Sequence, residues 1–456
     1  MTDALHDGAS AVEIATAVRG GLATAGLVVD ATLARIAARN PVVNAFTVLV
    51  ADRARERAAR LDMSRASGGA LGPLAGVPFG VKAMIDIAGV TTTAGSALHL
   101  RSPAALHDAA VVRRLEAAGA ICVGALNMDE FGLGGTTENA LYGPTRNPHD
   151  PARTAGGSSG GCAAAVAAGL VPLAIGGDAL GSIRLPASLC GVYGLRPTRG
   201  LVSRHGVMGG GGISTLGPMA RSAADIGLCH DVLIERAGAD RARAGDRADP
   251  GALRLALAGG YFRERLDPDA ADAVERAARA LAIDRVVDFP QPRLARAAAM
   301  LINTSETPVG KLDALRTRLE EFDPATRDRF LAHALMPAQW PLSAQRFREW
   351  HIGQVLRMFE SVDVLLLPAT PCTAPLLGTP TLVIDGVELP TGPTLGWFTQ
   401  PLAGTDCPAL TVPIARPGRL PIGIQLFAPP RCERWLVRIA QRLEAAGVAA
   451  APLAAS

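Results

Sequence analysis

The chain has 456 residues, 49% of them hydrophobic and 19% charged, a composition that excludes an intrinsically disordered protein; no run approaches the roughly 20 apolar residues that span a bilayer. The formal net charge is +3, with 45 basic and 42 acidic residues interspersed, and gives no reason to expect nucleic acid binding. Because MTDALHDGAS lacks the basic start and apolar stretch of a secretory signal, we expect a soluble cytoplasmic protein.

The first predicted elements alternate between helices and strands. In an N-terminal region over 1–65, apolar residues recur at helical spacing and predict two or three helices. Residues 73–90 are interpreted as a pair of buried strands with a turn near Gly89. A helix over 109–118 and a short strand over 121–124 follow. This order is typical of an α/β layer fold.

The second half of the chain contains further buried strands. Residues 235–252 are polar, charged and weakly periodic, and are the best candidate for an exposed insert. Three buried strands are predicted in VDVLLLPATP, ALTVPIA and PIGIQLFA, followed by a helix over 433–446. Because these late strands can complete a sheet begun before residue 200, we predict a single α/β domain over 1–456.

Two residue types are used unusually. The seven cysteines form no CxxC pair, and we expect them to be reduced and mostly buried, with no zinc site. Only two of the 45 basic residues are lysine, Lys82 and Lys311. Lys82 has apolar flanks, which favour a buried amine. Such an amine can lose its proton, whereas arginine cannot. The alternative is a charge on an edge strand that reaches water. Lys311, beside Gly310 in a polar stretch, has no such setting.

Two serines in glycine-rich segments are candidate catalytic hydroxyls. GGSSG at 156–160 matches the G-x-S-x-G pattern of α/β-hydrolases, but we predict no strand in the preceding RNPHDPARTA and no suitable histidine follows. The alternatives are an anion-binding loop, or an N-cap by Ser158 or Ser159 on a helix over 163–168. Ser182 lies between the buried run VPLAIGG and IRLPA, at a strand end where catalytic hydroxyls occur, or in a structural turn.

Together these segments resemble the amidase signature family. GVPFGVK, GGSSGG and D-x-x-G-S-I-R-x-P-A occur at the family's spacing within a signature core over 76–200, and weaker similarity runs to the C-terminus. The resemblance implies an amidase signature fold, a large mixed β-sheet with helices on both faces, and amide hydrolysis through an acyl-enzyme without a cofactor or metal. It also implies that Lys82 is the general base, Ser158 the cis-peptide relay serine and Ser182 the nucleophile.

The resemblance further implies an oxyanion hole made by the backbone amides of Ala179, Leu180, Gly181 and Ser182. Successive N–H groups in a glycine-rich loop suit this role because they stabilise the charge of a tetrahedral intermediate. The family usually has T-D-x-G-G-S here, so Leu180 replaces a glycine. A positive φ at Leu180 would cost roughly 1–2 kcal/mol. The substitution either reshapes the substrate pocket or marks an impaired paralogue.

Two branches of the family resemble this chain in MDEFGLGGTTENALYGPTRNPHD: the glutaminase subunits of tRNA-dependent amidotransferases, and the biuret or 1-carboxybiuret amidohydrolases. The first branch has an aspartate shortly before a P-x-N-L-A-G-like stretch, whereas residues 394–399 contain no acid, which favours the second. By a loose alignment with the amidotransferases, Arg329, and Arg327 next, are candidates for binding a substrate carboxylate. Tyr142 is a second candidate substrate contact.

Three functions therefore remain open. The preferred one is hydrolysis of a small polar amide, biuret-like and with or without a carboxylate, with release of ammonia. The second is the glutaminase subunit of an amidotransferase, which needs partner subunits and an ammonia tunnel. The third is a non-catalytic protein that kept the fold. The resemblance implies a homodimer, leaves open a small accessory subunit, and gives no role to nucleic acid or a membrane.

Overall fold

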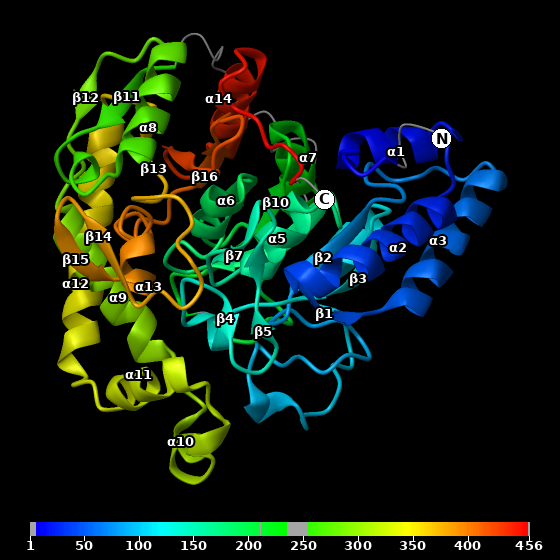
Figure 1. Ribbon diagram of the computed structural model, residues 1–456, viewed down its shortest axis with the longest axis horizontal. Helices are drawn as coiled ribbons and strands as arrows, with labels where there is room; N and C mark the ends of the chain where they lie inside the picture. The colour runs from blue at the N-terminus through cyan, green and yellow to red at the C-terminus, as the bar shows by residue number, and fades with distance from the viewer. Residues whose placement is uncertain (1–5, 210, 235–252, 455–456) are drawn as a thin grey trace.

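A single large mixed sheet lies at the centre of the computed structural model, which describes residues 6–209, 211–234 and 253–454 (Figure 1). Its strands pair in parallel around β2 and β11 and antiparallel elsewhere. In spatial order they are β1 (Phe46–Leu49), β3 (Ile121–Leu126), β2 (Pro78–Lys82), β8 (Leu173–Asp178), β10 (Thr215–Ala220), β9 (Tyr193–Arg196), β16 (Ala409–Pro413), β17 (Gly423–Phe427), β13 (Val364–Pro368), β11 (Leu255–Ala258) and β12 (Val286–Val287).

The central strands are buried at every position, from β3 through β13. Near-continuous burial means that both faces of the sheet are covered, as expected where helices pack on each side. The helices are α1 (Ala11–Arg19), α2 (Ala25–Val43), α3 (Ala51–Ala66), α4 (Ala110–Ala117), α5 (Gly160–Ala167), α6 (Arg184–Cys190), α7 (Ala223–Leu233), α8 (Pro268–Ala280), α9 (Pro292–Glu306), α10 (Leu312–Thr317), α11 (Pro324–Ala334), α12 (Gln339–Phe359), α13 (Thr391–Leu395) and α14 (Glu433–Ala445). The α/β fold with a large mixed sheet is thus confirmed.

Helix boundaries follow local capping chemistry. Ser10 caps α1 and forms a capping box with Glu13, which satisfies two backbone N–H groups at once. Asp267 caps α8 and Asp323 caps α11, each followed by a proline at the start of the helix. Helices α9 to α12 form one side of the molecule beside the hairpin of β14 (Thr381–Ile384) and β15 (Val387–Pro390), and α1 to α3 lie at the opposite side (Figure 1).

Most of the predicted elements are confirmed. The N-terminal helices are α1 to α3, the helix and strand after residue 109 are α4 and β3, and the three late strands are β13, β16 and β17, followed by α14. The late strands join the early ones where β16 pairs with β9. The single-domain organisation stays a prediction, and the expected insert over 235–252 lies outside the described residues.

Two predictions about strands are wrong. Residues 73–90 contain one strand, β2, because the chain turns directly after it, with the N–H of Ile85 donating to the carbonyl of Lys82 at 2.9 Å. The apolar residues after Lys82 are buried in that turn. In the segment RNPHDPARTA, β7 (Asp150–Thr154) is a strand that pairs with β6 (Arg146–Asn147) outside the large sheet. No helix of the described ranges is long and apolar enough to cross a membrane.

Candidate active site

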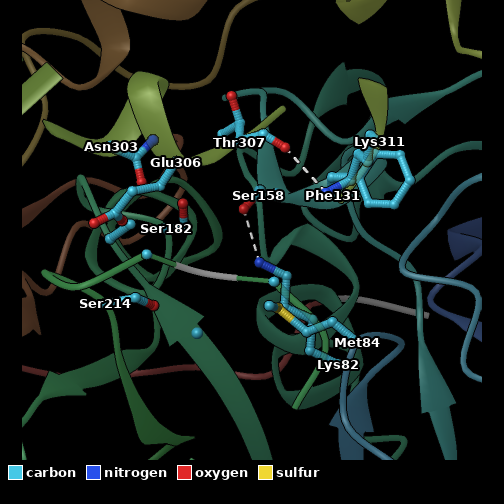
Figure 2. A pocket seen from close by; sticks show the side chains of 15 residues that line it. Lys82, Met84, Phe131, Ser158, Ser182, Ser214, Asn303, Glu306, Thr307 and Lys311 are labelled. Atoms are coloured by element: carbon cyan, nitrogen blue, oxygen red, sulfur yellow. Dashed lines mark hydrogen bonds between the residues drawn. The ribbon is translucent and has the colours of Figure 1, made fainter. Parts of the chain in front are cut away.

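The end of β2 and the start of α5 bring a buried lysine and a buried serine together. Lys82 is the last residue of β2, and its Nζ donates a hydrogen bond to the Oγ of Ser158 at 2.7 Å (Figure 2). Each of the two residues is only 1% exposed. The peptide bond between Gly157 and Ser158 is cis. The N-cap of α5 is Ser159, whose side chain forms no capping bond.

Burial makes the ammonium of Lys82 easier to deprotonate than that of an exposed lysine. Removal from water disfavours the ammonium and lowers the pKa of Lys82 to about 8, although Cys162, Asp129 and Asp178 act in the opposite direction. A neutral amine is therefore accessible close to neutral pH. In that form Lys82 can accept a proton from the hydroxyl of Ser158, with which it is already in contact.

Ser182 lies in the loop between β8 and α6, on the same cavity as the lysine and the relay serine. The loop is attached to the first serine segment by the N–H of Ser159, which donates to the carbonyl of Ser182 at 3.2 Å. Lys82, Ser158 and Ser182 all line one small cavity, and Figure 2 shows their side chains around it. The three residues that the sequence resemblance selected are thus neighbours in space.

Asp178 holds the loop that carries Ser182. Its carboxylate accepts hydrogen bonds from the N–H groups of Gly181 at 2.8 Å and Ile183 at 3.3 Å. It also pairs with Arg184 at 2.9 Å and Arg196 at 3.1 Å, in a cluster that is almost fully buried. The two guanidinium groups hold the pKa of this carboxyl far below its usual range. Sequence reasoning missed this role, although D-x-x-G-S-I-R contains both Asp178 and Arg184.

The proposed oxyanion loop needs one correction. The amide of Gly181 is already occupied by Asp178, whereas the amides of Ala179, Leu180 and Ser182 have no such acceptor among the described residues. Leu180 does not have a positive φ, so the strain considered for it is absent. The residue that needs glycine is Gly181, with φ +125° and a position where a Cβ would collide with Thr399. The Leu180 side chain instead packs beside α9.

Two adjoining cavities meet at Ser182. The smaller, of about 50 Å³, is called the lysine cavity, and its charged lining residues are Lys82, Glu306 and Lys311. The larger, of about 420 Å³, is called the acidic cavity, and its charged lining residues are Asp129, Glu130, Glu138, Asp323 and Arg329. The two cavities share Gly132, Ala179, Ser182 and Asn303. A substrate held at Ser182 therefore has two differently charged spaces beside it.

Asp129 is a buried carboxyl next to the relay serine that sequence reasoning did not select. Its N–H donates to the carbonyl of Ser158 at 3.3 Å, and its Oδ1 accepts from the N–H of Thr137 at 2.9 Å. Its Oδ2 has no hydrogen-bond partner in the described part of the chain. Burial raises the pKa of Asp129 to about 7, against the opposing effect of Lys82. The carboxyl and the amine are thus electrostatically coupled.

Of the candidate substrate contacts, Arg329 lines a cavity of the site and Tyr142 does not. Arg329, on α11, lines the acidic cavity and donates to the carbonyl of Leu133 at 3.0 Å. Arg327 pairs with its exposed neighbour Asp328 instead. Tyr142 donates to Thr93 at 3.0 Å and is not among the described residues that line either cavity. The structure therefore brings Arg329 to the site and does not bring Tyr142 there.

Two expectations about other residue types have different outcomes. None of the seven cysteines forms a disulfide, and five of them are buried, as expected. Lys311, which was expected to have no special setting, lines the lysine cavity beside the ring of Phe131. Within the described ranges there is no group of three or more His, Cys, Asp or Glu side chains that could hold a metal ion.

Comparisons with known proteins agree on one family. The family model called Amidase matches residues 27–437. AtzE, the 1-carboxybiuret hydrolase subunit of Pseudomonas sp. (strain ADP), is 44% identical over 451 residues, covering 96% of this chain and 98% of that protein. A glutamyl-tRNA(Gln) amidotransferase subunit of Chloroflexus aurantiacus is 36% identical over 479 residues, covering 96% of both.

Solved structures give the same result. One inhibitor-bound structure superposes with a TM-score of 0.92 at 42% identity. It is described as an unexpected vestigial protein complex that reveals the evolutionary origins of an s-triazine catabolic enzyme. The alignment covers 97% of this chain and 99% of the chain in that structure. A crystal structure of an amidase matches with a TM-score of 0.88 at 29% identity and covers 96% of this chain and 100% of that chain.

Proposed function

Because the chain belongs to the amidase signature family and is an amidohydrolase, we propose that it cleaves a C–N bond of a small biuret-like amide and releases ammonia. The observation that carries the proposal is the contact between Lys82 and Ser158, two buried groups on the cavity that Ser182 also lines. A serine hydroxyl is a weak nucleophile until a base removes its proton. A buried amine with a pKa of about 8 can be that base.

The proposed first half-reaction forms an acyl-enzyme. Neutral Lys82 takes the proton of Ser158, which takes the proton of Ser182, whose oxygen attacks the substrate carbonyl carbon. The amides of Ala179, Leu180 and Ser182 stabilise the resulting oxyanion. When the C–N bond breaks, the proton returns from Lys82 through Ser158 to the leaving nitrogen, which departs as ammonia.

The second half-reaction restores the enzyme. A water molecule attacks the acyl carbon and gives its proton to Lys82 through Ser158. Collapse of the tetrahedral intermediate releases the carboxylic product, and Ser182 recovers its proton through the same relay. Each proton that leaves a nucleophile is thus returned to a leaving group, and the serine relay serves both steps because its hydroxyl both donates and accepts.

The lining of the acidic cavity supports a substrate rich in N–H groups. Four carboxyl residues, Asp129, Glu130, Glu138 and Asp323, line it, and carboxylate oxygens accept hydrogen bonds from N–H donors. Linear amides of the biuret type carry several such donors. The 44% identity to a 1-carboxybiuret hydrolase subunit supports the same class, and extends it to substrates that carry a carboxylate.

We also propose an assembly and a location for the enzyme. The s-triazine enzyme structure is described as a protein complex, which supports an accessory subunit, and we propose that this chain forms a homodimer together with a small one. The absence of a disulfide among the seven cysteines agrees with a reducing compartment, and we propose that the enzyme is cytoplasmic.

A substrate panel tests the proposed function. Ammonia release is measured with biuret, 1-carboxybiuret, glutamine and simple monoamides. We expect the highest kcat/KM with the biuret-like compounds. The amidotransferase relatives, at 36% identity, make glutamine the second candidate. Turnover of glutamine alone would replace the proposal with a glutaminase, and failure of a fluorophosphonate to label the protein would show that it is not a serine hydrolase.

A further inference from the structure

The two lysines of the chain line the same cavity. Lys82 comes from β2, and Lys311 directly precedes α10, yet both belong to the lysine cavity with Ser158 and Ser182. All other basic residues of the sequence are arginine. The function of Lys82 as base accounts for one lysine only, and leaves the second cation of this cavity without a role.

The ammonium of Lys311 is held next to the catalytic pair. Its Nζ donates to the carbonyl of Thr307 at 3.0 Å and lies 4.6 Å from the centroid of the Phe131 ring (Figure 2). Gly132, which follows Phe131, lies close to the catalytic groups, since a Cβ built on it would be 3.4 Å from Ser158 Oγ and 4.0 Å from Lys82 Nζ. Lys311 is therefore held in the same small cavity as the catalytic groups.

Lys311 forms no ion pair with a carboxylate in the described part of the chain. The carboxylate of Glu306 in the same cavity accepts from the N–H of Gly212 at 2.6 Å. The carboxylate of Glu130 accepts from Ser96, Thr326 and the N–H of Asp323. Burial lowers the pKa of Lys311, and Glu130 only partly opposes this. A partly buried ammonium without an ion pair is stabilised when an anion arrives.

We propose that Lys311 binds the carboxylate of a carboxylated amide substrate in the lysine cavity while the scissile carbonyl lies at Ser182. The inference rests on the proposed function and names the group that selects the charged end of the substrate. A cavity of about 50 Å³ has room for a carboxylate, since each enclosed water needs about 10–15 Å³.

The charges favour Lys311 over Arg329, the candidate from the sequence resemblance. Arg329 shares its cavity with four carboxyl residues and already donates to the carbonyl of Leu133. A substrate carboxylate there would be repelled by these acids. In the lysine cavity it meets two amines and a single carboxylate that is already hydrogen-bonded.

The test compares a carboxylated substrate with its neutral counterpart in three variants. The measured quantity is the ratio of kcat/KM for 1-carboxybiuret to kcat/KM for biuret, in Lys311→Met, Lys311→Arg and Arg329→Met. We expect this ratio to fall about thirty-fold or more in Lys311→Met, and to recover partly in Lys311→Arg, because loss of a charged partner has effects of this size. We expect less than about a threefold change of the ratio in Arg329→Met, since that side chain lies in the other cavity.

A second readout is independent of turnover. Succinate, a small dicarboxylate, should protect Ser182 from a fluorophosphonate in the wild type, and Lys311→Met should need at least about tenfold more succinate for the same protection. If the wild type hydrolyses neither substrate while succinate protection depends on Lys311, the proposed substrate is wrong and the carboxylate site stands. An unchanged ratio with unchanged protection in Lys311→Met, or a fall confined to Arg329→Met, would overturn the inference.

Discussion

Lys82 is the residue on which the chemistry depends, because it can release its proton near neutral pH. Burial lowers its pKa to about 8, whereas a guanidinium keeps its proton throughout this range. We predict that Lys82→Arg loses about 10²–10⁴-fold in kcat, as Lys82→Ala does, although it keeps the positive charge. Ammonia release by both purified variants measures this, with circular dichroism as a check of folding. Activity of Lys82→Arg within about tenfold of wild type would exclude Lys82 as the base.

The pH dependence of the rate tests the coupling between Lys82 and Asp129. The rate should rise with pH through about 8, as Lys82 loses its proton. The carboxylate of Asp129 stabilises the ammonium of Lys82, so its removal lowers the pKa of the lysine further. We therefore predict that Asp129→Asn moves this ascending limb of the pH–rate profile to lower pH. Profiles of kcat/KM between about pH 6 and 10 measure it. A limb that stays in place or moves upward would show that Asp129 does not influence the base.

Single residues were predictable where the residue type itself carries the chemistry. Lys82 could be selected from the sequence because it is one of two lysines and has apolar flanks. Asp129 could not, since its importance comes from an unpartnered oxygen and from a contact with the relay serine that only folding creates. Tyr142 is expected to contact the substrate, but its hydroxyl bonds to Thr93 instead.

At the scale of elements, the loop between β8 and α6 is the part that must be rigid. Asp178 ends β8 and Arg184 begins α6, so their ion pair closes the loop that holds Ser182. Arg184 also donates to the carbonyl of Thr399 at 3.1 Å and to Gln425 at 2.8 Å. The nucleophile loop is thereby attached to the C-terminal part of the chain.

Removal of the Asp178 charge should destabilise the fold. Asp178→Asn leaves Arg184 and Arg196 buried without their counter-ion, and we predict a loss of about 3–5 kcal/mol in the free energy of unfolding. Glu264→Gln, which breaks the exposed pair with Arg293, is the matched control and should cost no more than about 1 kcal/mol. Urea unfolding of the two variants measures both values. Equal losses would show that the Asp178 cluster contributes no more than a surface ion pair.

Elements were predictable where hydrophobic pattern and element type agree. The late strands and α14 follow directly from apolar runs and helical spacing. Residues after Lys82 are apolar for another reason: they fill a buried turn, which pattern alone does not distinguish from a strand. The hairpin strand β7 was missed because its residues are polar and partly exposed, unlike those of the large sheet.

At the scale of the whole molecule, the sheet brings distant segments to one place. β2 and the two serine loops supply the catalytic residues, and α9, α11 and Lys311 from the second half supply part of the lining of the two cavities. Motifs at the family's spacing made the first set predictable. The second set was not, because nothing in the local sequence of Lys311 indicates that its ammonium reaches the cavity that Lys82, Ser158 and Ser182 line.

The assignment of Ser182 as the nucleophile is tested most directly by locating the residue that a fluorophosphonate modifies. The labelled protein is digested and the modified peptide is identified by mass spectrometry. We expect the label on Ser182, no labelling of Ser182→Ala, and ammonia release by that variant at or below a few per cent of the wild-type rate. Label on another residue, or ammonia release by Ser182→Ala close to that of the wild type, would contradict the proposed mechanism.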